Sequence, residues 1–132
     1  NYAIPITGFF AYTGHPSTET PSMIFGGALG FKVTNFWGWA EYLGQNTGDL
    51  SSGGWSITAL PRMPRYGALV FRYGRFDPNH DVTGDYSDQL IVGASHDFMD
   101  KVSLALTYES TMFETDSIDP VSGIFLHMQA GF

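Results

Sequence analysis

The feature that most constrains this chain is a period of two in its apolar residues, repeated along almost its whole length. In "GIFLHMQAGF" (residues 123–132), Ile124, Leu126, Met128 and Ala130 alternate with Phe125, His127 and Gln129. Such alternation is typical of a β-strand whose two faces meet different surroundings. Helical periodicity is nearly absent, so we expect an all-β protein.

Eight segments follow this pattern, and together they fill one domain spanning residues 1–132. The predicted strands are residues 4–13, 22–33, 36–46, 54–62, 66–76, 88–98, 101–113 and 123–132. Most run about ten residues, which is the length that a tilted strand needs to cross a bilayer.

The connections between these segments fall into two alternating classes. "GHPSTET", "NTGDLSSGG", "DPNHDVTGDYS" and "ETDSIDPVS" are long and polar, whereas "TN", "MPR" and "MD" are tight turns. Long loops on one side and short turns on the other are typical of transmembrane barrels. The sequence therefore predicts an eight-stranded antiparallel up-and-down transmembrane β-barrel.

The two faces of the predicted strands differ in size and polarity. In residues 22–33, Phe25, Leu29 and Phe31 share one face, and Gly26, Ala28 and Gly30 share the other. Charged residues make up 14% of the chain and aromatic residues 16%, which suits an apolar exterior around a small, polar interior. The alternative is a soluble, lipocalin-like barrel with the faces reversed, but its outer surface would carry few charges. The net charge of −7 argues against a nucleic-acid partner.

Two stretches resemble a known family. "FRYGRFDPN" (71–79) and "LIVGASHDFMDKVSLALTYES" (90–110), with the closing strand that ends at Phe132, resemble the last strands of bacterial porins of the phosphate-selective type. The resemblance implies an outer-membrane location, contact with lipid and lipopolysaccharide, and insertion by the barrel-assembly machinery through the C-terminal strand. Such porins have roughly sixteen or more strands. The chain is thus a complete small barrel, a trimmed derivative or part of a larger one.

The predicted lumen contains a polar network. Parity places these residues on the inner face: Glu41, Arg72, Glu109, His127 and Gln129. Arg72 between two carboxylates would tie opposite walls together and block free flow of solute. The alternative is a narrow ion pathway. A lipid-modifying enzyme built on His127 is a further alternative, but no nucleophile, base and orienting group occur at a recognisable spacing.

The most acidic loop carries oxygen ligands at calcium-loop spacing. Positions 1, 3, 5, 9 and 12 of the stretch 77–88 are Asp77, Asn79, Asp81, Asp85 and Asp88. Position 6 is Val82 where a glycine should make the turn, and position 12 is Asp where Glu is usual. We expect a solvated loop, with a weak Ca²⁺ site, or bridging of lipopolysaccharide phosphates through divalent cations, as the alternative.

These patterns favour a non-enzymatic outer-membrane barrel, acting as a porin-like pore of low conductance or as a structural element. A binding or adhesion barrel that acts through its acidic loops is the main rival. Because the predicted long loops are acidic and the short turns basic, the outer rim is expected to favour cations over anions. The sequence names neither a solute nor an oligomeric state.

Overall fold

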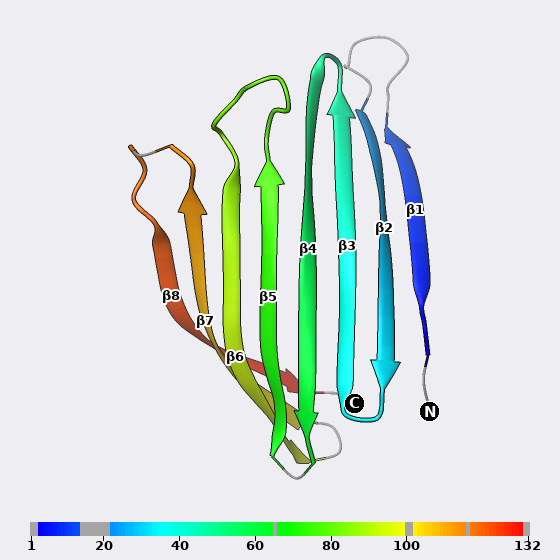
Figure 1. The fold of residues 1–132 in the computed structure, drawn as a ribbon, viewed down its shortest axis with the longest axis vertical. Coiled ribbons are helices and arrows are strands. Elements are labelled where there is room, and N and C mark those ends of the chain that lie inside the picture. Colours follow the sequence, from blue (N-terminus) through cyan, green and yellow to red (C-terminus); the bar gives the residue numbers. More distant parts are fainter. Residues whose placement is uncertain (1–2, 14–21, 65, 100–101, 116, 131–132) are drawn as a thin grey trace.

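The computed structural model describes residues 3–13, 22–64, 66–99, 102–115 and 117–130. It consists of eight strands in one sheet, and each strand pairs with its neighbours in the sequence (Figure 1). The strands are β1 (Ile6–Thr13), β2 (Ser22–Val33), β3 (Phe36–Thr47), β4 (Leu50–Met63), β5 (Gly67–Asp77), β6 (Ser87–Met99), β7 (Val102–Phe113) and β8 (Val121–Ala130). All seven pairings are antiparallel, so the predicted all-β, up-and-down topology is confirmed.

The pairing register keeps the two predicted faces apart across the sheet. One row of directly opposed residues runs Leu29, Ala40, Ile57, Tyr73 and Leu90 from β2 to β6. The neighbouring row on the other face joins Ala28, Glu41, Ser56, Gly74 and Gln89. Directly opposed residues share a face. The sheet therefore has an apolar face, which contains Leu29 and Ile57, and a polar face, which contains Glu41 and Gln89.

The prediction of a long loop after the third strand was wrong. β3 continues to Thr47 and β4 begins at Leu50, so the connection is a two-residue turn of Gly48 and Asp49, with Gly48 at φ 60°. The segment "SSGG" belongs to β4 and pairs with the end of β3, where the Ser51 hydroxyl donates to the Asn46 Oδ1 at 2.9 Å. Its Gly and Ser residues look like a loop in sequence, but cross-strand pairing extends the hairpin.

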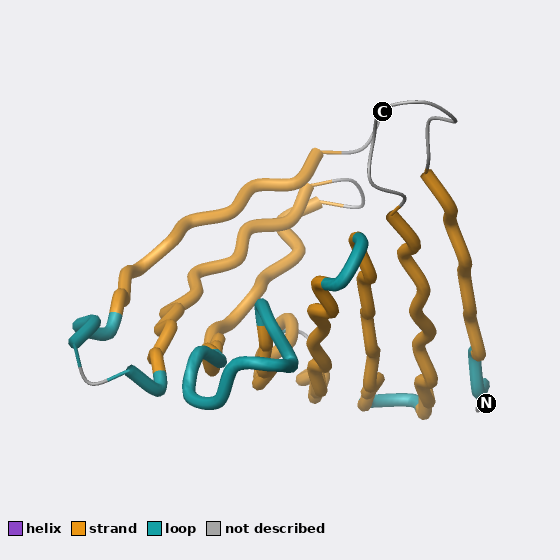
Figure 2. The backbone as a smooth tube through the Cα atoms, turned by 90° about the horizontal axis from the view of Figure 1, so that it is seen from above, coloured by secondary structure: helices purple, strands orange, loops and turns teal. Residues whose placement is uncertain are grey.

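The predicted closure into a barrel does not occur in the described part of the chain, where no ladder joins β1 to β8. Viewed from above, the sheet is a curved, open wall with β1 and β8 at its two ends (Figure 2). Strands β6–β8 run obliquely to β1–β5, and their lower ends swing toward the middle of the sheet (Figure 1). The sheet thus keeps two edge strands whose outer backbone groups have no strand beside them within the described ranges.

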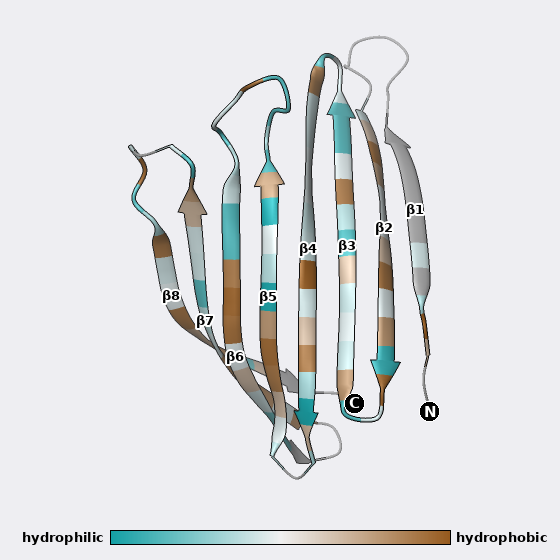
Figure 3. Ribbon diagram, in the orientation of Figure 1, coloured by the Kyte–Doolittle hydropathy of each residue, from teal (hydrophilic) through white to brown (hydrophobic). Residues whose placement is uncertain are grey.

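Burial is inverted relative to a water-soluble domain. Among the described residues, Ala68 is the one buried hydrophobic residue, whereas three polar residues are buried: Ser56, Thr58 and Thr107. Large apolar side chains are exposed, including Leu29 at 56%, Ile57 at 55% and Leu106 at 55%. Hydrophobic and polar bands alternate along the strands (Figure 3). The chain exposes 9576 Å², against about 6,900 Å² for a compact protein of its mass.

Candidate functional site: the polar face of the sheet

The centre of the polar face is an ion pair that spans three strands. The Arg72 guanidinium of β5 donates to the Glu41 Oε1 of β3 at 2.7 Å. The buried Ser56 hydroxyl of β4, between them, donates to the same oxygen at 2.6 Å. The Arg72 Nε is enclosed without a hydrogen-bond partner. The pair is half-exposed in the open sheet, so it fixes the positions of side chains more than it adds stability.

A second cluster lies on the polar face of β7 and β8. The Thr107 hydroxyl lies 3.0 Å from Glu109 Oε1 and 2.9 Å from His127 Nε2, and Glu109 Oε1 lies 3.4 Å from the same His127 nitrogen. A nucleophile relay needs the hydroxyl and the carboxylate on different imidazole nitrogens. Here both approach Nε2, so the arrangement is a hydrogen-bonded cluster that braces the two strands.

The expected single network is thus two clusters. In register, Ile91 of β6 lies between Arg72 and Glu109. Glu41 and Glu109 each lie two strands away from Arg72, on opposite sides. The Arg72 guanidinium is turned to Glu41, and among the described contacts it is not joined to Glu109. The prediction of one arginine between two carboxylates was therefore wrong. Gln129 pairs in register with Ser103, as its predicted parity requires.

The 77–88 stretch folds into consecutive turns rather than around a central point. The Asp77 Oδ1 accepts from the Asn79 amide at 3.0 Å, and the Asn79 Oδ1 accepts from the Asp81 amide at 3.1 Å. Asp88 lies on β6, where Arg75 donates to both of its oxygens at 2.8 and 3.0 Å. Within the described ranges no three acidic, His or Cys side chains gather as metal ligands. The alternative of a Ca²⁺ site therefore has no preformed cluster among Asp77, Asn79, Asp81, Asp85 and Asp88.

Sequence reasoning missed the Arg75–Asp88 pair, which lies on the apolar face near the upper end of the sheet. The Arg75 guanidinium also lies over the Tyr86 ring, 3.9 Å from its centre. Burial raises the pKa of the Tyr86 phenol, and the nearby Glu114 carboxylate raises it further. The signal in the sequence is the hairpin itself, because Arg75 and Asp88 flank the loop at opposed positions.

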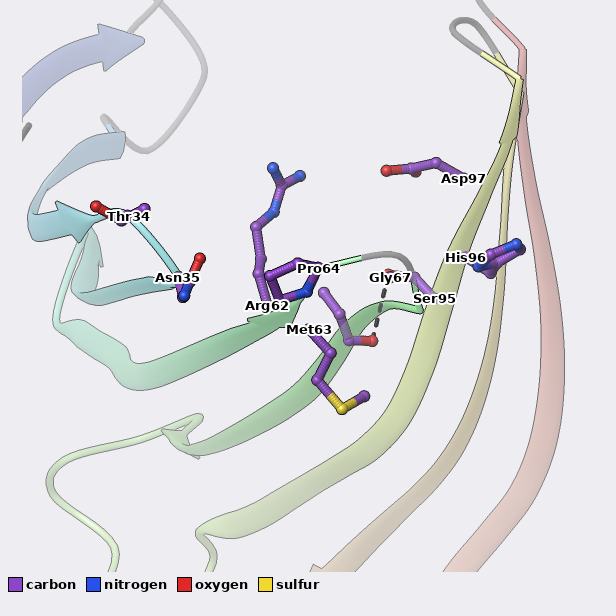
Figure 4. A pocket seen from close by; sticks show the side chains of 10 residues that line it. Thr34, Asn35, Arg62, Met63, Pro64, Gly67, Ser95, His96 and Asp97 are labelled. Carbon is purple, nitrogen blue, oxygen red and sulfur yellow. Dashed lines mark hydrogen bonds between the residues drawn. The ribbon is translucent and has the colours of Figure 1, made fainter.

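A cavity of about 410 Å³ opens at the lower end of the sheet, near the short turns (Figure 4). It is lined by Thr34 and Asn35 of the β2–β3 turn, by Arg62, by Ala68 and by Ser95 and Asp97 of β6, among others. Arg62 also packs against Trp37, with its guanidinium carbon 5.1 Å from the ring centre. The register places both Arg62 and Asp97 on the polar face.

Within the described residues, no helix is long and apolar enough to cross a membrane. Comparison of the chain with protein-family models, with curated proteins and with solved structures finds no match.

Proposed function

We propose that this chain forms the wall of a bacterial outer-membrane β-barrel and acts as a non-enzymatic, porin-like pore of low conductance or as a structural barrel. The observation that carries the proposal is the inverted burial of the sheet. Its large apolar side chains are exposed on one face, while the small polar residues Ser56, Thr58 and Thr107 are buried on the other. Lipid outside and a narrow polar lumen inside would satisfy both faces.

Aromatic side chains on the apolar face support this orientation. Toward the upper end, Phe25, Tyr42, Trp55 and Tyr73 follow one another across β2–β5, with ring centres 6.1 Å apart for the first two and 5.6 Å apart for the last two. Toward the lower end, Phe31 and Phe36 stack at 5.2 Å. Leu29, Ala40 and Ile57 lie between the two groups. Aromatic residues at both ends of an aliphatic band suit the two interfaces of a bilayer.

The stagger of the strands supports closure of β1 onto β8. The row of opposed residues that starts at Ile6, near the lower end of β1, reaches Ser122, near the upper end of β8. Placing Ile6 beside Ala130, at the lower end of β8, closes the ring with a shift of eight residues along the strand. Eight strands with that shift tilt by about 35°, within the range of membrane barrels.

Neighbouring residues on β7 provide the test. Leu106 lies on the apolar face and Ala105 on the polar face, paired with Leu126 and His127. Leu106→Arg should cost about 2 to 4 kcal/mol in lipid, as for arginine near the bilayer midplane, and Ala105→Arg should cost much less. Stability is measured by unfolding in vesicles, with heat-modifiable migration as the sign of folding. Equal costs, or a larger cost for Ala105→Arg, would reverse the faces and overturn the proposal.

Conductance in planar bilayers then separates a pore from a purely structural or adhesive barrel. The rival function is binding through the outer loops. It would use acidic residues in the connections after β5 and β7, such as Asp81, Asp85 and Glu114. A folded, inserted barrel that passes no ions would favour this rival.

A further inference from the structure

The cavity at the lower end of the polar face has a floor of small side chains. Arg62, Ala68 and Ser95 are directly opposed on β4, β5 and β6. Two strand spacings place the backbones of Arg62 and Ser95 about 10 Å apart. Between these two backbones, Ala68 contributes only a methyl group. The Ser95 hydroxyl donates to the Ala68 carbonyl oxygen at 3.4 Å. The space above these two residues is therefore open for a bound molecule.

The two sides of this cavity carry opposite charges that do not meet. Figure 4 shows the Asp97 carboxylate directed across the cavity toward the side that holds Arg62. No ion pair within 4.0 Å joins them in the described part of the chain, although other such pairs form. Lys32 reinforces the positive side, because its Nζ lies 4.1 Å from the centre of the Trp37 ring on which Arg62 also packs.

This distribution of charge selects the kind of ligand. A simple anion would be attracted by Arg62 and Lys32 but repelled by Asp97, and a simple cation would meet the reverse. A molecule with a carboxylate at one end and an ammonium group at the other satisfies both sides. The guanidinium fork of Arg62 suits a carboxylate, and Asn35 and Thr34 add amide and hydroxyl groups at the rim.

We propose that this cavity binds small zwitterions of the α-amino-acid class, with the carboxylate on Arg62 and the ammonium group on Asp97. The inference rests on the proposed barrel for its biological meaning, since it makes the cavity a solute subsite at the short-turn mouth of the lumen. Its volume of about 410 Å³ exceeds what glycine needs, so amino acids with side chains also fit.

The experiment is isothermal titration calorimetry of the folded protein in detergent micelles at constant ionic strength. The probes are glycine, acetate and methylamine, which present both charges, the carboxylate alone and the ammonium group alone. We expect glycine to bind in the millimolar range and each single-charge probe to bind at least about tenfold more weakly. Acetate or methylamine binding as tightly as glycine would overturn the proposal, as would the lack of any heat with glycine.

Charge variants test the two contacts. Arg62→Gln and Asp97→Asn should each weaken glycine binding by at least about tenfold. Arg75→Gln and Asp81→Asn make the same changes in net charge far from the cavity and should leave binding within about twofold. The double variant Arg62→Asp with Asp97→Arg keeps both charges and should restore part of the affinity. Equal losses in the distant variants would mean that net charge alone attracts the ligand, and the site would be rejected.

The outcomes separate this inference from the proposed function. A chain that inserts into lipid as a barrel but gives no heat with glycine contradicts the subsite and leaves the barrel standing. A chain that binds glycine in detergent but fails the Leu106→Arg and Ala105→Arg comparison contradicts the membrane wall alone.

Discussion

The closing register can be tested with one pair of cysteines. If Ile6 lies beside Ala130, antiparallel counting places Gly8 beside Met128. The chain contains no cysteine, so Gly8→Cys with Met128→Cys introduces the one possible disulfide. Gly8 is opposed on its other side by Gly27, which has no side chain.

The structure sets how selective this cross-link should be. Directly opposed residues have Cβ atoms about 4.5–5.5 Å apart, whereas residues displaced by two along the partner strand are about 7–8 Å apart. A disulfide tolerates the first separation and not the second. Pairing of Gly8 with Ala130 would correspond to a tilt of about 41°, and pairing with Leu126 to about 28°.

The assay is oxidation of the lipid-reconstituted variant, followed by non-reducing electrophoresis and mass measurement. We expect an intrachain disulfide for Gly8 with Met128. Gly8 with Leu126 should cross-link poorly, and Gly8 with His127, whose side chain lies on the other face, should not cross-link. Closing so long a loop should also stabilise the fold by about 4 to 5 kcal/mol in the chain-entropy description. Disulfide-linked dimers would show that two copies share the barrel, and the lack of any cross-link would refute closure by these edges.

Three further outcomes follow from individual contacts. Arg72→Ala should cost only about 1 kcal/mol if the sheet stays open, because the Glu41 pair is half-exposed, but about 3 to 5 kcal/mol in a closed lumen. Chemical unfolding in vesicles distinguishes the two outcomes, and Glu41→Gln is the matched partner variant. Gly44→Val should displace the Phe25 ring that lies over Gly44 and cost about 1 to 3 kcal/mol, and an unchanged unfolding midpoint would contradict that packing. Calcium should leave the melting temperature unchanged, because Arg75 occupies both oxygens of Asp88; a rise that is reversed by a chelator would restore the calcium-loop hypothesis.

The sequence by itself determined the strands and their faces. A period of two can be read without knowing the partner strand, because each side chain's face depends only on its place in its own strand. The predicted strand over 22–33 matches β2, and the parity of Glu41, Arg72, Glu109 and His127 agrees with the register. Composition misled where Gly and Ser residues are paired, as at "SSGG".

The tertiary structure decided which polar residues meet. Parity puts Arg72, Glu41 and Glu109 on one face, and register puts each carboxylate two strands from Arg72. The tertiary structure decides that the guanidinium turns to Glu41. Likewise, the spacing of oxygen ligands along 77–88 could not predict that Asp88 lies on a strand beside Arg75. The opposition of Arg62 and Asp97 depends on two hairpins together, β4–β5 and β5–β6. Contacts across strands depend on the accumulated register of the sheet, which no local sequence pattern encodes.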